Sequence, residues 1–292
     1  MRVYEIPEGS RTSKGRAIQN LINIEQDDKV KAFICTKDLK DEDYINKHYV
    51  IMATKKGQVK KTSLEKYSRP RINGINAITI KEGDELLVAK LTNGESQVMM
   101  ALKSGKAIRF EEVKTRPMGR SASGVRGIRL QHDKDEVIGM VSVNDMESNI
   151  LVVSSNGYGK RSKLEDYRVT NRGGKGVKTI SITDKTGSLV SIKNVNDSNG
   201  LMIINKSGIA IRMAVKDLRV MGRATQGVKL INIKRGDSIA AVAKVIHEEQ
   251  DEQEETIMQT ENTTSSEIEN VIESTKDISL EITNEEQENT EE

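Results

Sequence analysis

The sequence predicts an all-β fold of propeller type, built from a repeated unit of about 50 residues. Each unit carries a hairpin glycine with a basic residue four positions later, and a second glycine 17 to 19 residues after the first. The first glycines are Gly57, Gly105, Gly157 and Gly208, and the second are Gly74, Gly124, Gly176 and Gly227, spaced by 50, 52 and 51 residues. A partial copy at Gly15 opens the chain, and no segment before residue 247 shows a sustained helical period.

Each complete unit is predicted to begin with a β-hairpin. An apolar strand such as 50–54 runs into a Lys-Lys-Gly, Lys-Ser-Gly or Ser-Asn-Gly turn, whose glycine supplies the positive φ of a tight turn. A second strand, such as 58–61, then returns along the first. The later hairpins are predicted at 98–101 with 107–110, 150–153 with 158–162, and 201–204 with 209–213.

Two further strands are predicted in each unit. An alternating, Ile-containing segment suits a strand with one wet face, and it recurs at 22–24, 78–80, 128–130, 180–182 and 231–233. A nearly continuous apolar strand suits a buried inner position, and it recurs at 86–89, 137–140, 189–192 and 239–242. Residues 36–48 are predicted to be a surface excursion, and residues 1–4 to be the second strand of a hairpin whose first strand lies upstream.

The charge divides the chain near residue 247. Residues 248–292 hold 17 acidic residues and one lysine, whereas residues 1–247 hold 45 basic and 27 acidic residues, a net charge of +18. We therefore predict a basic β domain at 1–246, whose partner is a polyanion, and an acidic tail at 247–292. The tail lacks aromatic residues and glycine, so we predict that it is disordered in isolation.

The sequence shows no pattern typical of a catalytic, nucleotide or metal site. His48, His132 and His247 share no metal-ligand spacing with one another or with Cys35, and a lone cysteine fits a reducing cytoplasm. The glycine-rich stretch 172–179 lacks the full phosphate-loop pattern. We find no signal peptide and no apolar run long enough for a membrane span. We predict a non-catalytic, cytoplasmic chain that needs no cofactor or metal.

The cations of the repeats keep a fixed register with the glycines. Basic residues recur four positions after the hairpin glycine, and eight and four positions before the second glycine. General surface polarity explains their abundance but predicts no register and no preference for arginine, although duplication alone could also preserve a register. The candidate DNA-binding residues are Arg11, Lys14, Arg16, Lys60, Lys61, Arg69, Arg71, Arg109, Arg116, Arg120, Arg126, Lys160, Arg161, Arg168, Arg172, Lys175, Lys178, Arg212, Arg219, Arg223 and Lys229.

Arginine beside glycine suits contact with a phosphate backbone. The guanidinium binds phosphate through two hydrogen bonds, and glycine lets the backbone N–H groups approach the same anion. Tryptophan is absent and Phe and Tyr total eight, which disfavours stacking on single-stranded bases. The sequence therefore predicts binding to the backbone of double-stranded DNA, with little direct reading of bases.

Five segments carry a resemblance to a known family. They are Val3-Tyr4-Glu5-Ile6-Pro7, Gly57-Gln58-Val59-Lys60-Lys61-Thr62, Met118-Gly119-Arg120 with Gly124–Leu130, Asn156–Arg161, and Gly222–Val228. Over residues 1–246 the chain resembles the C-terminal DNA-wrapping domain of bacterial DNA gyrase A, a family shared with the corresponding protein of topoisomerase IV. The resemblance implies a six-bladed β-pinwheel whose blades exchange strands, and whose rim bends DNA to support ATP-dependent negative supercoiling.

The resemblance also implies what lies outside this sequence. The family's catalytic tyrosine domain and its glycine-rich signature box both precede the matched region, so about five of six blades are expected here, and the chain is expected to be a fragment. ATP, Mg²⁺ and the partners in the full enzyme, the rest of gyrase A and the gyrase B protein, act through other parts. Alternatives are a topoisomerase IV domain, a propeller that scaffolds proteins, and a hydrolase propeller, for which the sequence offers no acidic or metal cluster.

Overall fold

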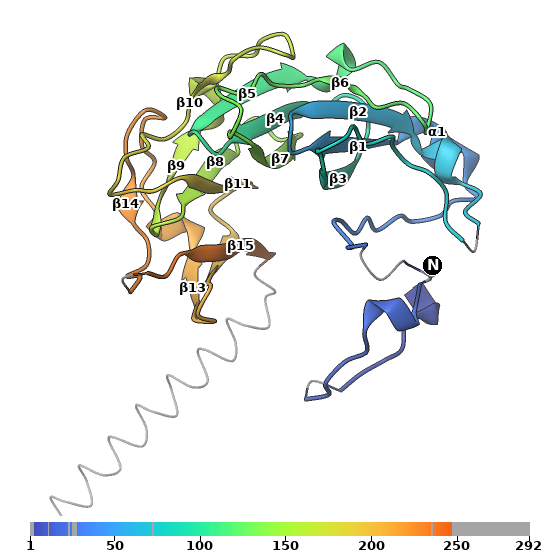
Figure 1. Cartoon of the computed structure of the whole chain (residues 1–292), viewed down its shortest axis with the longest axis horizontal. Helices are drawn as coiled ribbons and strands as arrows, with labels where there is room; N and C mark the ends of the chain where they lie inside the picture. Colours follow the sequence, from blue (N-terminus) through green and yellow to red (C-terminus); the bar gives the residue numbers. More distant parts are fainter. Residues whose placement is uncertain are drawn as a thin grey trace, which may run out of the picture. The chain divides into compact units, whose positions relative to one another are not determined.

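In the computed structural model, the repeats form four antiparallel β-sheets that stand next to one another in chain order (Figure 1). The structure describes residues 3–10, 12–22, 24, 28–71, 73–234 and 236–246. The predicted all-β architecture is confirmed. The predicted tail, 247–292, lies outside the described residues.

Each sheet, or blade, is built around one hairpin. The first blade has the order β3-β1-β2-β6, with β1 at Tyr49–Thr54, β2 at Gln58–Ser63, β3 at Leu86–Thr92 and β6 at Val125–Arg126. The second has the order β10-β5-β4-β7, with β4 at Gln97–Leu102, β5 at Lys106–Glu111, β7 at Val137–Val143 and β10 at Val177–Lys178. The third has the order β11-β8-β9-β14, with β8 at Asn149–Ser154, β9 at Tyr158–Lys163, β11 at Leu189–Val195 and β14 at Val228–Lys229. The fourth has the order β13-β12-β15, with β12 at Asn199–Asn205, β13 at Ala210–Ala214 and β15 at Ile239–Ile246.

The predicted hairpins and apolar strands are confirmed. In the first hairpin Val50 lies opposite Thr62 and Ala53 opposite Val59, and Gly57 at its tip has φ +85°. The apolar strands β3, β7, β11 and β15 begin where they were predicted and extend three or four residues further. They form one edge of each blade, and β3 contacts β7 as β7 contacts β11, so these edges converge. We call them the inner strands.

The alternating segments after the second glycine are not strands, contrary to prediction. Only the two residues directly after Gly124, Gly176 and Gly227 pair in a sheet. The isoleucines that produced the alternation instead cover the hairpin tip: the N–H groups of Gly127 and Ile128 both donate to the Gly57 carbonyl. Ile128 is buried in the core. The alternating pattern therefore came from a side chain that covers the hairpin tip, and not from a strand with one wet face. The segment 22–24 includes Asn23, which lies outside the described residues.

Short helical elements also differ from expectation. Residues Val3–Glu5 form the 3₁₀ turn η1 rather than a strand, and a second turn, η2, spans Ile18–Asn20. The excursion 36–48 contains a short helix, α1 at Glu42–Lys47, capped by the Asp41 side chain, which accepts a hydrogen bond from the Tyr44 N–H at 3.1 Å. A single turn of helix is too short to give a periodic signal. The remaining 3₁₀ turns follow the hairpins: η3 at Leu64–Tyr67, η4 at Glu112–Lys114, η5 at Leu164–Asp166 and η6 at Val215–Asp217.

Neighbouring blades exchange strands. The outer strand β6 comes from the second repeat but pairs with β2 of the first blade, and β10 and β14 pair in the same way with β5 and β9. The exchange implied by the family resemblance is therefore present. Because each outer strand is donated by the next repeat, no repeat in the first three blades forms a complete sheet alone.

The apolar core is divided into layers between the blades. In β4, Met100 packs with Ile51 of the first blade, while Met99 packs with Ile150 of the third. Successive residues of a strand point to opposite faces, and here both faces are covered. This explains why the central strands are continuously apolar instead of alternating.

We predict that Gly124→Ala destabilises the domain by about 2–4 kcal/mol. Gly124 has φ +87°, and an added Cβ would lie 2.6 Å from the Val59 carbonyl oxygen in the exchanged strand pair. Urea unfolding followed by circular dichroism measures the change. Gly119→Ala is the matched control, because a Cβ there meets nothing within 4 Å and we expect a change below about 1 kcal/mol. Equal stability of the two variants would contradict the importance of the strand crossing.

Candidate nucleic-acid interface

Five of the predicted DNA-binding cations are buried, and we remove them from the interface. Their side chains are engaged inside the domain, where no DNA phosphate can reach them. They are Lys60, Lys61, Arg109, Lys160 and Arg161, with exposed fractions of 0, 4, 9, 1 and 7%. Their register with the hairpin glycines therefore reflects a structural role.

The cation four residues after each of the first three hairpin glycines binds the next blade. Arg109 Nη1 donates to the Leu164 and Tyr167 carbonyl oxygens, at 2.7 and 3.0 Å, around the turn η5 of the third blade. Arg161 donates from Nε to the Leu218 carbonyl, beside η6. In the first blade Lys61 forms a buried ion pair with Glu112 of η4 at 3.5 Å. We call these three side chains the blade latches.

A second buried cation, one position earlier, supports the turn that approaches the outer strand. Lys60 Nζ donates to the Ala77 carbonyl at 2.6 Å and to the Arg120 carbonyl. Lys160 Nζ donates to the Gly222 carbonyl at 2.5 Å and to Thr225 Oγ1 at 3.1 Å. Burial lowers the pKa of each lysine to about 8. The second blade has Ile108 at the equivalent position, so lysine support alternates along the described blades.

Two rows of exposed cations remain on the outer side of the first three blades. One row lies on the outer strands themselves, and the other lies eight residues before the second glycine, where each turn approaches the preceding hairpin. The first row is Arg126, Lys178 and Lys229, and the second is Arg116, Arg168 and Arg219. We call the outer strands and the turns that lead into them the rim.

Half-buried arginines link the successive turns of the rim. Arg172 Nε donates to the Lys114 carbonyl at 3.0 Å, and its Nη1 donates to the Arg126 carbonyl at 3.3 Å. Arg223 Nη1 donates to the Lys178 carbonyl at 3.0 Å. At the equivalent position on the first blade, the backbone carbonyl of Arg120 accepts a hydrogen bond from Lys60. These side chains position their neighbours as well as adding positive charge.

Backbone bonds reinforce these links. The Gly173 N–H donates to the Gly127 carbonyl at 2.6 Å, and the Ser181 N–H donates to the Thr225 carbonyl at 3.1 Å. On the first blade the Thr79 hydroxyl donates to the Ser121 carbonyl at 2.6 Å. The rim is thus one hydrogen-bonded series of turns, and its spacing is fixed by the protein.

The remaining predicted cations lie near the surface but outside these two rows. Lys14, Arg16, Arg69, Arg71, Lys175 and Arg212 are exposed. Arg11 lies outside the described residues. Sequence reasoning missed the exposed Arg129, whose N–H donates to the Gly174 carbonyl at 2.9 Å on the rim. It also missed Lys90 and Lys193 of the inner strands, whose pKa values are lowered first by burial and then by nearby lysines. For both residues, the signal available in the sequence was a lysine within an otherwise apolar strand.

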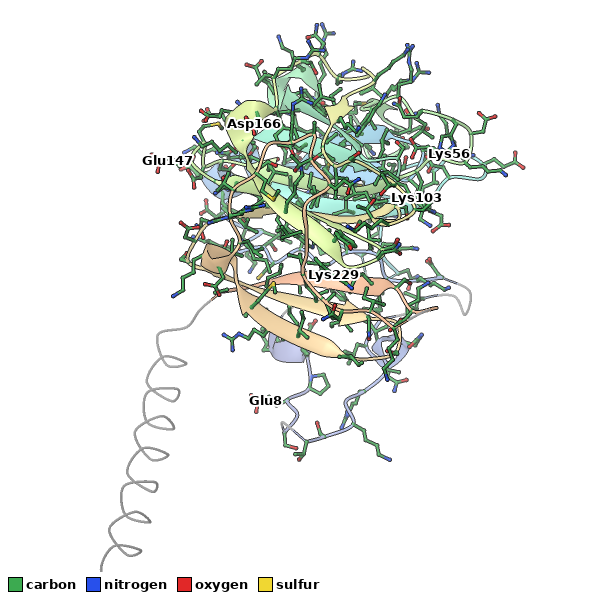
Figure 2. The ribbon with its side chains drawn as sticks, turned by 90° about the vertical axis from the view of Figure 1, so that its left-hand side faces the viewer. Glu8, Lys56, Lys103, Glu147, Asp166 and Lys229 are labelled. Carbon is green, nitrogen blue, oxygen red and sulfur yellow. The ribbon has the colours of Figure 1, made fainter. Side chains whose placement is uncertain are left out.

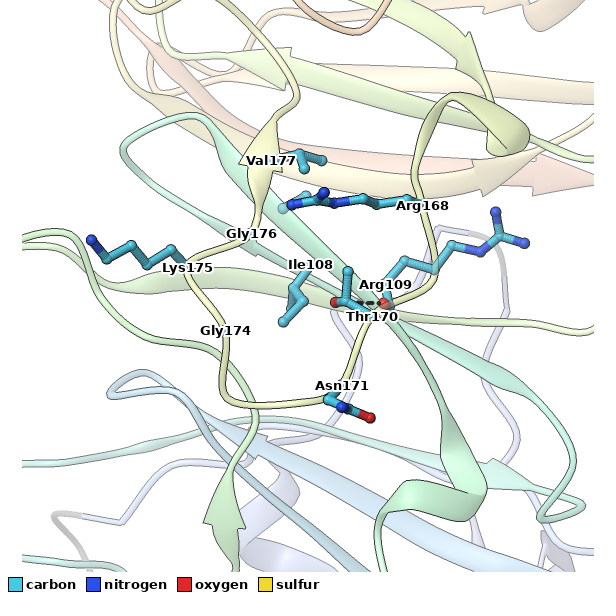
Figure 3. Close-up of a pocket in the computed structure, with 10 residues that line it drawn as sticks. Ile108, Arg109, Arg168, Thr170, Asn171, Gly174, Lys175, Gly176 and Val177 are labelled. Atoms are coloured by element: carbon cyan, nitrogen blue, oxygen red, sulfur yellow. Dashed lines mark hydrogen bonds between the residues drawn. The ribbon is translucent and has the colours of Figure 1, made fainter.

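A shallow pocket of about 220 Å³ lies on the rim, between β5 and the third repeat's turn (Figure 3). Its lining includes Arg168 and Lys175 but no acidic residue. Figure 3 shows Arg168 lying beside Val177, while Lys175 is directed away from the pocket. Thr170 closes its floor by donating from Oγ1 to the Arg109 carbonyl at 3.2 Å. This lining suits an anion.

The hairpin tips lie on one side of the blades. Figure 2 places Lys56 and Lys103, at the hairpin tips, on one side, and Glu147 and Asp166 on the other.

Among the described residues, no group of three His, Cys, Asp or Glu side chains is placed to hold a metal ion, and no helix could span a membrane.

Comparisons with known proteins identify the repeats. The family model described as the DNA gyrase C-terminal domain, a beta-propeller, matches residues 1–37, 48–93, 97–144, 148–196 and 201–246. The chain is 42% identical over 256 residues to DNA gyrase A of Staphylococcus aureus strain NCTC 8325, covering 87% of this chain and 28% of that protein. DNA gyrase A of Staphylococcus epidermidis is also 42% identical, over 250 residues, covering 85% of this chain and 27% of that protein.

Solved structures match the fold. A DNA gyrase A C-terminal domain superposes with a TM-score of 0.71 at 24% identity, covering 84% of this chain and 78% of that chain. A topoisomerase IV C-terminal domain superposes with a TM-score of 0.76 at 23% identity, covering 89% and 79%. The topoisomerase IV domain superposes slightly better, so the fold does not distinguish the two proteins, and the gyrase relationship rests on the family model and the sequence relatives.

We predict that raising the pH from 8 to 10.5 stabilises the wild type relative to Lys160→Met. The folded state holds Lys160 at a pKa of about 8, below its usual 10.5, so in this window the unfolded chain binds the extra proton. If the folded state loses this proton across the whole window while the unfolded chain keeps it, the free energy of unfolding rises by up to about 3 kcal/mol. The measurement is the difference in urea unfolding free energy between the two proteins at several pH values. A difference that falls as the pH rises would mean that the buried site favours the charged lysine.

Proposed function

This chain belongs to the DNA gyrase C-terminal domain family, and we propose that it binds double-stranded DNA along its rim and bends it. The single observation that supports the proposal most is the pair of cation rows, repeated at the same positions on three successive blades. A row of cations with the period of the fold suits the regular phosphate backbone of a duplex.

The rim favours contact with phosphates over reading of bases. The exposed cations stand on short strands and turns, and no helix of the described chain projects from the rim toward a groove. We therefore propose binding that is strongly salt-dependent and weakly sequence-dependent.

The energy of bending sets how much each contact must contribute. Bending a 20–30 base-pair site by 40–90° costs on the order of 1–6 kcal/mol. Shared over the two rows and the linking arginines, this requires less than about 1 kcal/mol from each cation, so no single arginine is indispensable. A rim whose turns are already hydrogen-bonded in series loses little conformational entropy when DNA binds.

We propose that the chain acts as part of a gyrase-type topoisomerase and not as an enzyme by itself. It spans 28% of the length of the Staphylococcus aureus protein that it matches. The remainder of gyrase A, together with the gyrase B protein, would supply DNA cleavage and the chemistry of ATP and Mg²⁺, with the whole complex in the bacterial cytoplasm.

We predict that replacing Arg126, Lys178 and Lys229 together by Gln weakens duplex binding and makes it less salt-dependent. Each lost phosphate contact lowers the magnitude of the log–log salt slope by about 0.9, so the triple variant should lose about 3 from the slope. Fluorescence anisotropy on two unrelated duplexes of equal length measures both the slope and the sequence preference.

The control removes the same charge elsewhere. Lys37, Lys40 and Lys47 are exposed in the excursion 36–48, outside the outer strands and the turns that lead into them, and their triple Gln variant should keep the wild-type slope. Equal slopes for the two triple variants would indicate binding by overall charge and would overturn the rim interface. A strong preference for one duplex would instead indicate base reading.

We predict that deleting the acidic tail, residues 248–292, tightens duplex binding at low salt. The tail carries a charge of −16 and is tethered to a body of +18, so it competes with DNA at a high effective concentration. The gain should shrink as added salt screens both interactions. Equal affinity of the two chains at low ionic strength would mean that the tail is a bystander, and weaker binding after deletion would mean that it supports the complex.

A further inference from the structure

A small cavity lies between the inner strands of the first three blades. It measures about 170 Å³, and its lining comes from β3, β7 and β11. β7 contacts both of the other strands, and Figure 1 shows the three strands on the same side of their blades. All three strands lie inside the repeat series, and each is paired within its own blade. The cavity is therefore formed entirely by strands of complete sheets.

The polar side chains of the cavity can all donate hydrogen bonds. They are Lys90 of β3 and Lys193 and Ser191 of β11, and every other residue of the lining is apolar. The lining includes no acidic residue. Because each inner strand is the edge of its blade, alternate backbone N–H groups also point away from the sheet. The cavity is thus rich in donors and positive charge.

A third lysine adds to this charge. Burial is the main cause that lowers the pKa of Lys90, followed by the charges of Lys193 and of Lys244 on β15. For Lys193, burial is followed by the charge of Lys244. Three ammonium groups from three blades therefore lie close enough to repel one another.

The described part of the chain supplies no counter-charge to this cluster. No Nζ atom of the three lysines has a hydrogen-bond or ion-pair partner there, and every charge that shifts the pKa of Lys90 or Lys193 is another lysine. The buried Lys61, in contrast, has Glu112 as its partner. A charge that is partly removed from water without a partner is unfavourable, so a cluster of such charges needs another explanation.

Packing does not require lysine at these positions. Lys90, Val141 and Lys193 occupy the same place in their inner strands, each opposite the third residue of β1, β4 or β8. Val141 is buried there in the core. The second blade therefore forms the same sheet with an apolar residue, and the two lysines are better explained by a ligand that binds them.

We propose that the cavity binds one phosphate group through Lys90, Lys193 and Ser191. A lysine ammonium is a compact point charge, which suits a small oxyanion. Sites for drug-sized ligands usually measure about 300–1,000 Å³, so this cavity accommodates a phosphate group and excludes a nucleoside. The ligand is inorganic phosphate or the end of a polyphosphate, whose next phosphate would lie toward Lys244. A bound phosphate would neutralise the repulsion and connect the inner strands.

The test uses the full chain, free of nucleic acid, titrated with inorganic phosphate in a calorimeter at constant pH and ionic strength. We expect one site per chain. The unfolding temperature should rise with phosphate concentration, because a ligand that binds only the folded state stabilises it.

The variant that removes the site combines Lys90→Met with Lys193→Met. Loss of one charged hydrogen bond weakens binding about tenfold or more, so the double variant should show no calorimetric site. Methionine keeps the volume of the lysine stem at a position that is apolar in the second blade. The variant should therefore fold, and without phosphate it should unfold at a higher temperature than the wild type.

The matched control combines Lys178→Met with Lys229→Met. It removes two exposed lysines from the rim and should keep the phosphate site. Duplex binding should be unchanged in the inner-strand variant, so this site and the rim interface can fail separately. The proposal is overturned by a wild type that binds phosphate no better than chloride, by equal phosphate binding of the wild type and the inner-strand variant, or by loss of the site in the rim variant.

A second titration, with tripolyphosphate, distinguishes the two sources of the phosphate group. Tighter binding than that of inorganic phosphate identifies a polyphosphate as the ligand, and Lys244→Met should then remove the gain. Binding no tighter than that of inorganic phosphate identifies free phosphate.

Discussion

The structure depends on one recurring interaction: a buried cation on the hairpin of one blade binds the 3₁₀ turn of the next. Arg109 donates to the Leu164 and Tyr167 carbonyls, Arg161 donates to the Leu218 carbonyl, and Lys61 meets a buried carboxylate. Removing such a partner leaves buried polar groups unsatisfied, which costs more than the bond itself contributes. The latch therefore fixes each blade against its neighbour, and the exchanged outer strands and interblade cores are built on that spacing.

The same spacing sets the positions of the turns that make up the proposed DNA-binding rim. Because the turns are linked by Arg172, Arg223 and backbone bonds, the exposed cations keep their positions without DNA. A surface whose turns are already ordered loses little conformational entropy when it binds a partner. Structural cations inside the domain and exposed cations on the rim come from the same repeats, but the structural cations lie on the central hairpin strands and the exposed ones on the outer strands and the turns that lead into them.

The sequence predicted the fold well and the interface only partly. Hairpin glycines and apolar strands are local signals, and they located the strands β1 to β5 and their copies. The register of Lys61, Arg109 and Arg161 was correctly detected, but sequence distance alone cannot show that a long side chain points into the neighbouring blade. The alternation at Ile128 has the period of a strand, yet it arises because Ile128 and Leu130 pack into the core beneath a hairpin tip. Burial by the next repeat depends on residues that lie about 70 positions away in the chain.

Strand exchange between repeats also has a consequence for synthesis on the ribosome. The first hairpin ends at Ser63, but its outer strand ends at Arg126. At about 5–20 residues per second, the hairpin waits roughly 3 to 12 seconds after its own synthesis before its sheet can close. Each blade in turn emerges with one edge unpaired, and it becomes complete only when the following repeat has been translated.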